Sequence, residues 1–155
     1  MGTQTNLALA VSLDPTLHER VTLTMMAGSY QSFGNASFVA EFNIFADPEA
    51  AKIVFQKFPF FTMVPWENFD MSLSWSVFEE IFDPKISPLS SFFRQVLASL
   101  EKTIREIKYL AGPYIVDAVA MYALLDPSSV IESVEIFGAV ETGGEFSRGA
   151  TVFDW

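Results

Sequence analysis

The sequence predicts an α/β fold with an open, mainly parallel sheet and flanking helices. Half of the 155 residues are hydrophobic and only 18% are charged, a composition typical of a chain with a buried core. Two short apolar runs, Val21–Met26 and Phe60–Val64, suit strands buried on both faces, as parallel sheets require. The length fits one domain, since domains commonly have about 100–200 residues. We therefore expect residues 1–155 to form a single domain or part of one.

The first half of the chain predicts a βαβ unit. Residues 2–13 place apolar residues in a helical register, and Asp14-Pro15 ends this helix before the first strand. A second helix begins at Asp47-Pro48-Glu49, which supplies an N-cap, a first-turn proline and a first-turn acid. The strand Phe60–Val64 follows, and Pro65 ends it. This order favours a right-handed crossover with the functional residues at the strand ends.

The second half is mostly helical at first and then strand-like. Between Ser72 and Tyr109, two helical faces carry apolar residues that we expect in the core: Trp75, Phe78, Ile81 and Phe82, and then Phe92, Phe93, Val96, Leu97, Leu100 and Ile104. Asp117 begins another apolar helix, which Asp126-Pro127 ends. We expect strands at Val130–Val140 and Thr151–Trp155.

Charge and composition exclude several classes of protein. The net charge is −10, and no Lys or Arg cluster is present to bind phosphates, so we expect no nucleic-acid partner. The chain has no cysteine, which excludes disulfides and thiolate chemistry. We find neither the pattern of a signal peptide nor an apolar run of about 18 residues, so we expect no membrane association and a cytoplasmic protein.

The segment Gly34–Asn43 carries the most informative polar residues. Asn35, Glu41 and Asn43 lie in apolar surroundings after a predicted strand, and buried polar groups need partners. Their side chains suit a ligand rich in hydroxyl groups. The alternative is that Asn35 follows Gly34 in a turn while Glu41 and Asn43 point into solvent from an extended stretch. Spacing alone leaves both interpretations open.

The run GNASFVAEFNIFADPEAAKIVF (residues 34–55), followed by FTMVPWE (61–67), resembles the central signature of the inosine/uridine-preferring nucleoside hydrolases. The resemblance extends over most of the chain, from TNLALA (5–10) to RGATVFDW (148–155), and is weakest between Phe69 and Lys108. It implies an open, mainly parallel α/β sheet. It also implies an enzyme of nucleoside catabolism and of purine and pyrimidine salvage, which splits the N-glycosidic bond of a ribonucleoside into ribose and free base with a calcium-bound water.

Residue by residue, the resemblance assigns a sugar site and part of a metal site. Asn35, Glu41 and Asn43 match residues that hold the ribose hydroxyls, and Met26 matches a residue near the sugar. Asp117 and the backbone carbonyl of Thr5 match calcium ligands. Oxygen ligands are what a hard cation such as calcium prefers. The expected partner is therefore a ribonucleoside or ribose.

The sequence departs from the family pattern at two places. The Asp-rich opening of the form DxDxGxDD, which supplies most of the metal carboxylates and the base, is absent from the chain. We therefore expect residues 1–155 to be the C-terminal portion of the domain, and we expect calcium not to be held by this chain alone, since calcium takes about six to eight oxygens. Val116 occupies a position where known members carry a histidine that protonates the leaving base, and valine cannot donate a proton.

Two alternatives to an active hydrolase stay open. The first is a non-catalytic relative, which either binds ribose or nucleosides or docks through a bare sheet edge on a second copy or a full-length homologue. The second is a truncated isoform. The remaining polar residues suggest no further chemistry. We expect His18 at the surface and Ser128-Ser129 and Gly143-Gly144 in loops. Trp66 and Glu67 follow the second strand at a sheet end, where we expect them mainly in packing, the alternative being that they border the pocket.

Overall fold

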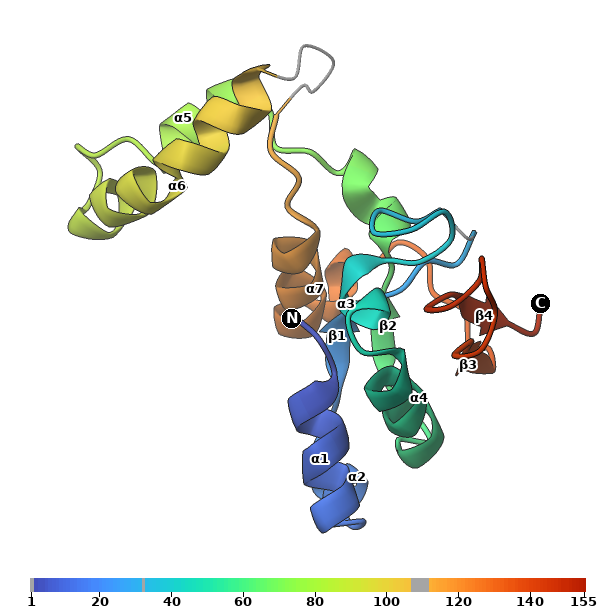
Figure 1. The fold of residues 1–155 in the computed structure, drawn as a ribbon. Helices are drawn as coiled ribbons and strands as arrows, with labels where there is room; N and C mark the ends of the chain where they lie inside the picture. The colour runs from blue at the N-terminus through green and yellow to red at the C-terminus, as the bar shows by residue number, and fades with distance from the viewer. Residues whose placement is uncertain (1, 32, 107–111) are drawn as a thin grey trace. The chain divides into compact units, whose positions relative to one another are not determined.

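The computed structural model describes residues 2–31, 33–106 and 112–155, and these divide into two compact units. The first unit comprises residues up to Asn68 together with Val116–Trp155, and the second comprises Phe69–Ile115. Figure 1 shows helices around short strands in the first unit and paired helices in the second. The predicted α/β class is confirmed.

A pair of parallel strands forms the centre of the first unit. Strand β1 (Thr24–Met26) pairs with β2 (Thr62–Val64), and Met26 lies opposite Val64. Met25 and Met26 are both buried, as expected for a strand covered on both faces. Helix α7 (Val116–Leu125) packs against both strands. Both strands are shorter than predicted, because the residues that precede them do not join the ladder.

Two helices connect the parallel strands. The short α3 (Phe42–Phe45) leads to α4 (Pro48–Lys57), whose N-cap Asp47 accepts a hydrogen bond from Ala50 N at 3.1 Å. The predicted helix start at Asp47-Pro48-Glu49 is therefore confirmed. Strand, helices and strand make the βαβ order that the sequence predicts.

The core of the first unit lies between α4, α1 and the strands. Helix α1 (Thr5–Leu13) packs against α4, and α2 (Leu17–Arg20) packs against α1. The buried cluster comprises Ala8, Val11, Met25, Ala27, Ile44, Ala50, Ala51, Val54, Phe58 and Val140. The His18 ring meets the Phe58 ring edge-on at 6.5 Å, and His18 Nδ1 lies 2.9 Å from the Pro15 carbonyl oxygen.

The C-terminal part adds an antiparallel pair. After the short η2 (Pro127–Ser129), β3 (Gly138–Val140) pairs with β4 (Thr151–Phe153), and β3 packs on α4. The prediction of a strand over all of Val130–Val140 is wrong, because residues 130–137 have no strand partner and most are exposed. Arg148 in the connection between β3 and β4 forms a bidentate ion pair with Glu49 of α4, at 2.7 and 2.8 Å.

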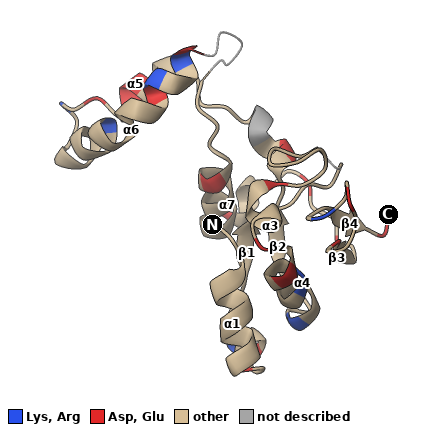
Figure 2. Ribbon diagram, viewed as in Figure 1, with Lys and Arg blue, Asp and Glu red and all other residues tan. Residues whose placement is uncertain are grey.

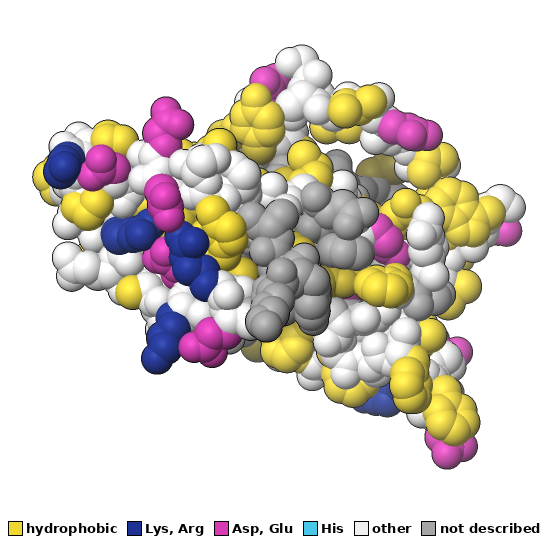
Figure 3. Space-filling view, turned by 90° about the horizontal axis from the view of Figure 1, so that it is seen from above, with side chains coloured by type: hydrophobic (Ala, Val, Ile, Leu, Met, Phe, Trp, Pro, Cys, Tyr) yellow, Lys and Arg dark blue, Asp and Glu magenta, His cyan; other side chains and the backbone are white. Residues whose placement is uncertain are grey.

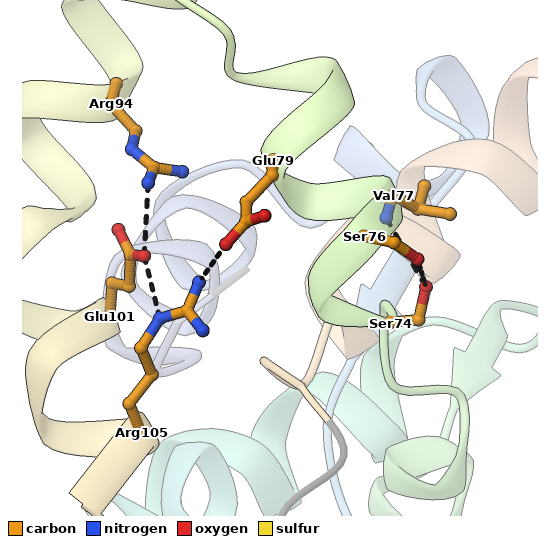
Figure 4. Close-up of polar contacts among 7 residues, drawn as sticks. All are labelled: Ser74, Ser76, Val77, Glu79, Arg94, Glu101 and Arg105. Atoms are coloured by element: carbon orange, nitrogen blue, oxygen red, sulfur yellow. Dashed lines mark hydrogen bonds and ion pairs between the residues drawn. The ribbon is translucent and has the colours of Figure 1, made fainter.

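The second unit is built on a pair of helices. It contains α5 (Trp75–Ile81) and α6 (Pro88–Glu106), which follow η1 (Trp66–Asp70) along the chain. Arg105 of α6 bonds Glu79 of α5 at 2.6 Å and Glu101 at 2.9 Å, as Figure 4 shows. Its guanidinium carbon also lies 3.8 Å from the centre of the Trp75 ring. These contacts tie the two helices together. The predicted helical residues 107–109 lie outside the described residues.

Much of the apolar surface of α5 and α6 is exposed. Phe78 and Ile104 are buried as expected, but the prediction of core positions is wrong for Ile81, Phe92, Phe93, Val96 and Leu100, which are 39–58% exposed. Two helices cover only their facing stripes, so the outer stripes need a further layer. Figure 3 shows apolar side chains among the charged ones at the surface.

The charged residues are dispersed. Lys and Arg are spread over α4, α6 and the connection between β3 and β4 in Figure 2, and acidic residues lie among them. No helix in the described part of the chain is long and apolar enough to span a membrane.

Replacing Phe58 tests the position of the core. Phe58→Ala should lower the free energy of unfolding by about 3–5 kcal/mol, because the ring is 1% exposed and its loss leaves a cavity. Phe60→Ala is the matched control, since Phe60 is 75% exposed and should change stability little. Urea unfolding of both variants measures the difference. Equal losses in the two variants would contradict this placement of the core.

Candidate functional site

Glu41 is a buried carboxylate at the start of α3. It is 2% exposed and acts as the N-cap of this short helix. Its Oε1 accepts from Asn43 N at 2.8 Å, while Oε2 accepts from Gly28 N at 2.9 Å and Ile44 N at 3.3 Å. A helix start leaves amide groups without partners, and a carboxylate satisfies them. The helix and the turn after β1 thus share one buried acceptor.

Burial raises the pKa of the Glu41 carboxyl above its usual value. The backbone amides of Asn43, Gly28 and Ile44 lower the pKa, but by less than burial raises it, and the negative charge of Asp117 adds a smaller upward effect. A group of this kind is typical of functional sites, where charge is held in place at a cost to stability.

Asn35 and Asn43 are each held at one end of the side-chain amide. Asn35 Oδ1 accepts from Phe42 N at 2.8 Å, which leaves Nδ2 as the free end. Asn43 Nδ2 donates to the Met26 carbonyl oxygen at 3.1 Å and lies 3.4 Å from Met26 Sδ, which leaves Oδ1 as the free end. These bonds fix which way each amide points.

The hydrogen-bonding groups that stay free around α3 include both acceptors and a donor. A carboxylate has about four acceptor positions, and three backbone amides occupy three of those of Glu41, two of them on Oε2. One position on Oε1 therefore stays free. Together with Asn43 Oδ1 and Asn35 Nδ2, for which no partner is found among the described residues, the site offers two acceptors and one donor.

The structure excludes the solvent-facing, extended arrangement of Glu41 and Asn43. The alternative in which Glu41 and Asn43 point into solvent from an extended stretch is wrong, because Glu41 is buried and both belong to the start of α3. Asn35 is exposed and lies in a turn whose amides bond the Ala40 carbonyl. Hydrogen bonds join Asn35, Glu41, Asn43 and Met26 through the backbone of α3 and the end of β1, so these residues are brought together.

Asp117 and Thr5 do not complete a metal site. Asp117 is an exposed residue in the first turn of α7, and Thr5 is an exposed residue at the start of α1, with Oγ1 2.5 Å from Asp47 Oδ2. Among the described residues, no three His, Cys, Asp or Glu side chains gather to hold a metal ion. One carboxylate and one carbonyl fall short of the donors that calcium takes. The described residues therefore supply too few ligands to hold a calcium ion by themselves. Val116, beside Asp117, is buried.

A second set of residues, around the turn after β1, was missed by reasoning from the sequence. Ser29 and Thr151 are buried and bonded to each other, and Glu67 bonds both Ser29 and the Gln31 amide. We expected Glu67 mainly in packing, and its carboxylate instead joins this turn. Ser29 and Thr151 are 122 residues apart, so no local pattern indicates their contact. The local signal for this turn is Gly28, a glycine two residues after the predicted strand Val21–Met26.

Comparison with solved structures shows the same fold over the whole chain. An inosine-guanosine nucleoside hydrolase superposes with a TM-score of 0.90 at 30% identity, covering 99% of this chain and 48% of that one. A plant nucleoside hydrolase gives a TM-score of 0.86 at 27% identity, with the same two coverages. These likenesses agree with the fold that the sequence predicts.

Sequence comparison identifies the family. An inosine-uridine preferring nucleoside hydrolase of Crithidia fasciculata is 32% identical over 156 residues, covering 99% of this chain and 49% of the relative. The pyrimidine-specific ribonucleoside hydrolase RihA of Salmonella enteritidis is 31% identical, covering 99% of this chain and 50% of the relative. The chain thus spans about half the length of these relatives. Since the model of the inosine-uridine preferring nucleoside hydrolases matches residues 1–155, the chain belongs to that family.

Proposed function

We propose that Asn35, Glu41 and Asn43 hold the sugar hydroxyls of a ribonucleoside, with Met26 beside the sugar. The observation that carries this proposal is the set of free groups around α3, with acceptors at Glu41 Oε1 and Asn43 Oδ1 and a donor at Asn35 Nδ2. A hydroxyl group both donates and accepts, so neighbouring hydroxyls match such a set. The other end of the Asn35, Glu41 and Asn43 side chains is already bonded, so little side-chain freedom is lost on binding.

The reaction that we propose is hydrolysis of the N-glycosidic bond to ribose and free base. It is supported by membership of the family and by relatives whose names describe nucleoside or ribonucleoside hydrolysis. In such a reaction the sugar acquires positive charge in the transition state, and side chains that grip it more tightly there accelerate the step. The free acceptor of the buried Glu41 carboxylate suits this role.

This chain does not supply every group that the reaction needs. Val116 precedes Asp117 and cannot protonate the departing base, so the proposal assigns no acid to this chain. We propose Asp117 and the Thr5 carbonyl as this chain's share of the family's calcium ligands. The proposed setting is nucleoside salvage in the cytoplasm, and the relatives' names differ in the base they specify.

Association with another chain is a second candidate function. It is favoured by large apolar side chains at the surface of the described residues, among them Leu13, Phe38 and Phe137, which are 78%, 83% and 74% exposed. The partner that we propose is a second copy or a longer homologue. Sedimentation should show a mass above 17.3 kDa for the pure chain if it pairs with itself.

Removing one free donor tests the sugar site. Asn35→Ala should weaken ribose binding by about 3- to 10-fold, the effect of one neutral hydrogen bond. The thermal midpoint should change little because Asn35 is exposed. Calorimetric titration with ribose and with inosine measures the affinity of the wild type and of Asn35→Ala. The control is Gln56→Ala, which removes an exposed amide on α4. A wild-type chain that binds neither ribose nor a ribonucleoside would contradict the proposed function.

Calcium should bind weakly to this chain. Millimolar calcium should leave the thermal midpoint nearly unchanged, because a ligand stabilises a fold only at concentrations near or above its dissociation constant. Asp117→Asn should respond in the same way as the wild type. A rise in midpoint that calcium causes in the wild type and that Asp117→Asn abolishes would show that the chain completes the metal site by itself.

The ionisation of Glu41 should make stability depend on pH. Folding raises the pKa of Glu41, so the folded state holds the proton more tightly than the unfolded state, in which the pKa is near 4.5. The contribution of Glu41 to stability is therefore full below the unfolded pKa and is lost as pH rises through the folded pKa. The measured quantity is the difference between the free energies of unfolding of the wild type and of Glu41→Gln. We expect this difference to decrease as pH rises from 4. A difference that instead grows with pH would mean that the three amides outweigh burial.

A further inference from the structure

The turn Gly28–Ser29 links the end of β1 to the Glu41 carboxylate. Gly28 N donates to Glu41 Oε2 at 2.9 Å in a buried position. Gly28 has a φ of +70°, and a Cβ built on it would lie 2.9 Å from Thr151 Cγ2 and 3.2 Å from Met63 Sδ. Only glycine fits here, because the conformation and the space both exclude a side chain. The amide that reaches Glu41 is thus packed directly against β4 and β2.

One hydroxyl group holds both backbone groups of Ser29. Thr151 Oγ1 accepts from Ser29 N at 2.9 Å and donates to the Ser29 carbonyl oxygen at 2.5 Å. Ser29 is 1% exposed and Thr151 is 3% exposed, so water does not compete for these bonds. Breaking them leaves two buried backbone groups without partners, which is costly.

Glu67 holds the other side of the turn. Its Oε1 accepts from Ser29 Oγ at 2.6 Å and from Gln31 N at 2.7 Å, and Ser29 Oγ accepts from Phe33 N at 2.7 Å. The residue before it, Trp66, donates its amide to the Gly28 carbonyl oxygen at 2.8 Å. The segment after β2 therefore adds hydrogen bonds to the turn that are separate from those of Thr151.

We propose that Ser29, Glu67 and Thr151 are positioning residues for the sugar site: by fixing the Gly28–Ser29 turn, they hold the Gly28 amide on Glu41 Oε2. This inference rests on the proposed function for the ligand, since Glu41 is the carboxylate that we assign to the sugar. With Oε2 held, the carboxylate keeps one orientation and presents the free position of Oε1 to the ligand. If the turn shifts, Oε2 loses a charge-assisted bond and the carboxylate rotates.

The variant Thr151→Val tests the proposal in the full chain. Valine has nearly the shape of threonine but no hydroxyl, so the two bonds to Ser29 are lost while the packing against Gly28 is kept. Thr151→Ser keeps the hydroxyl and should behave like the wild type. Thr62→Val is the matched control, because Thr62 lies on β2 and is exposed.

The first measurement is the proton chemical shift of the Gly28 amide in the free protein, which reports on its bond to Glu41 and needs no ligand. We expect this resonance to move upfield in Thr151→Val and to stay in place in Thr151→Ser and Thr62→Val. The second measurement is ribose affinity, which should fall about 10-fold or more in Thr151→Val only, as expected when a charge-assisted bond is lost.

Each result decides the proposal. An unchanged Gly28 resonance in Thr151→Val overturns it, and so does a changed resonance with unchanged ribose affinity. If the wild type binds no ribose, the proposed function is wrong, whatever the result for the turn. The Gly28 amide resonance then shows by itself whether the turn positions Glu41. If Thr151→Val does not fold, Ser29→Ala, which removes the hydroxyl between Glu67 and Phe33, is judged by the same two measurements.

Discussion

The buried Glu41 carboxylate, with backbone amides from two segments on it, is the contact on which the rest of the site depends. Its bonds to Asn43 N and Ile44 N start α3, and its bond to Gly28 N joins that helix to the turn after β1. Moving a charge out of water is unfavourable unless donors replace the water, and here backbone groups do so. The same bonds that make burial tolerable leave one acceptor position unoccupied. Local structure and the proposed sugar binding therefore have one physical origin.

The parallel pair β1 and β2 determines where this carboxylate lies. Both strands end at the same edge, so the turn after β1 and the η1 segment after β2 meet there. The carboxyl ends of parallel strands are the usual place for ligands in α/β sheets. Helix α7 packs against both strands and places the charge of Asp117 within reach of Glu41. Function at the strand ends, which the strand order predicts, thus agrees with the geometry of the site.

Asn35 and Asn43 show how similar side chains acquire different roles. Each is bonded to the backbone through one end of its amide, but Asn35 uses its oxygen and Asn43 its nitrogen. The first is left as a donor and the second as an acceptor. A pair of amides pointing in this way matches hydroxyl groups, which both donate and accept. The residue types alone do not distinguish the two, because either end of an amide can be the bonded one.

The sequence by itself determined the α/β class, the capped start of α4 at Asp47-Pro48, the end of α7 at Asp126-Pro127 and the candidate residues Asn35, Glu41 and Asn43. These follow from periodicity, capping and family resemblance, which are local or directly readable along the chain. Tertiary structure decided the burial of Glu41, the exposure of the outer face of α6 and the short extent of β3. It also decided the contact of Thr151 with Ser29 across 122 positions. The reason is that burial and pairing depend on which distant segments cover a residue, and that information is absent from any short stretch of sequence.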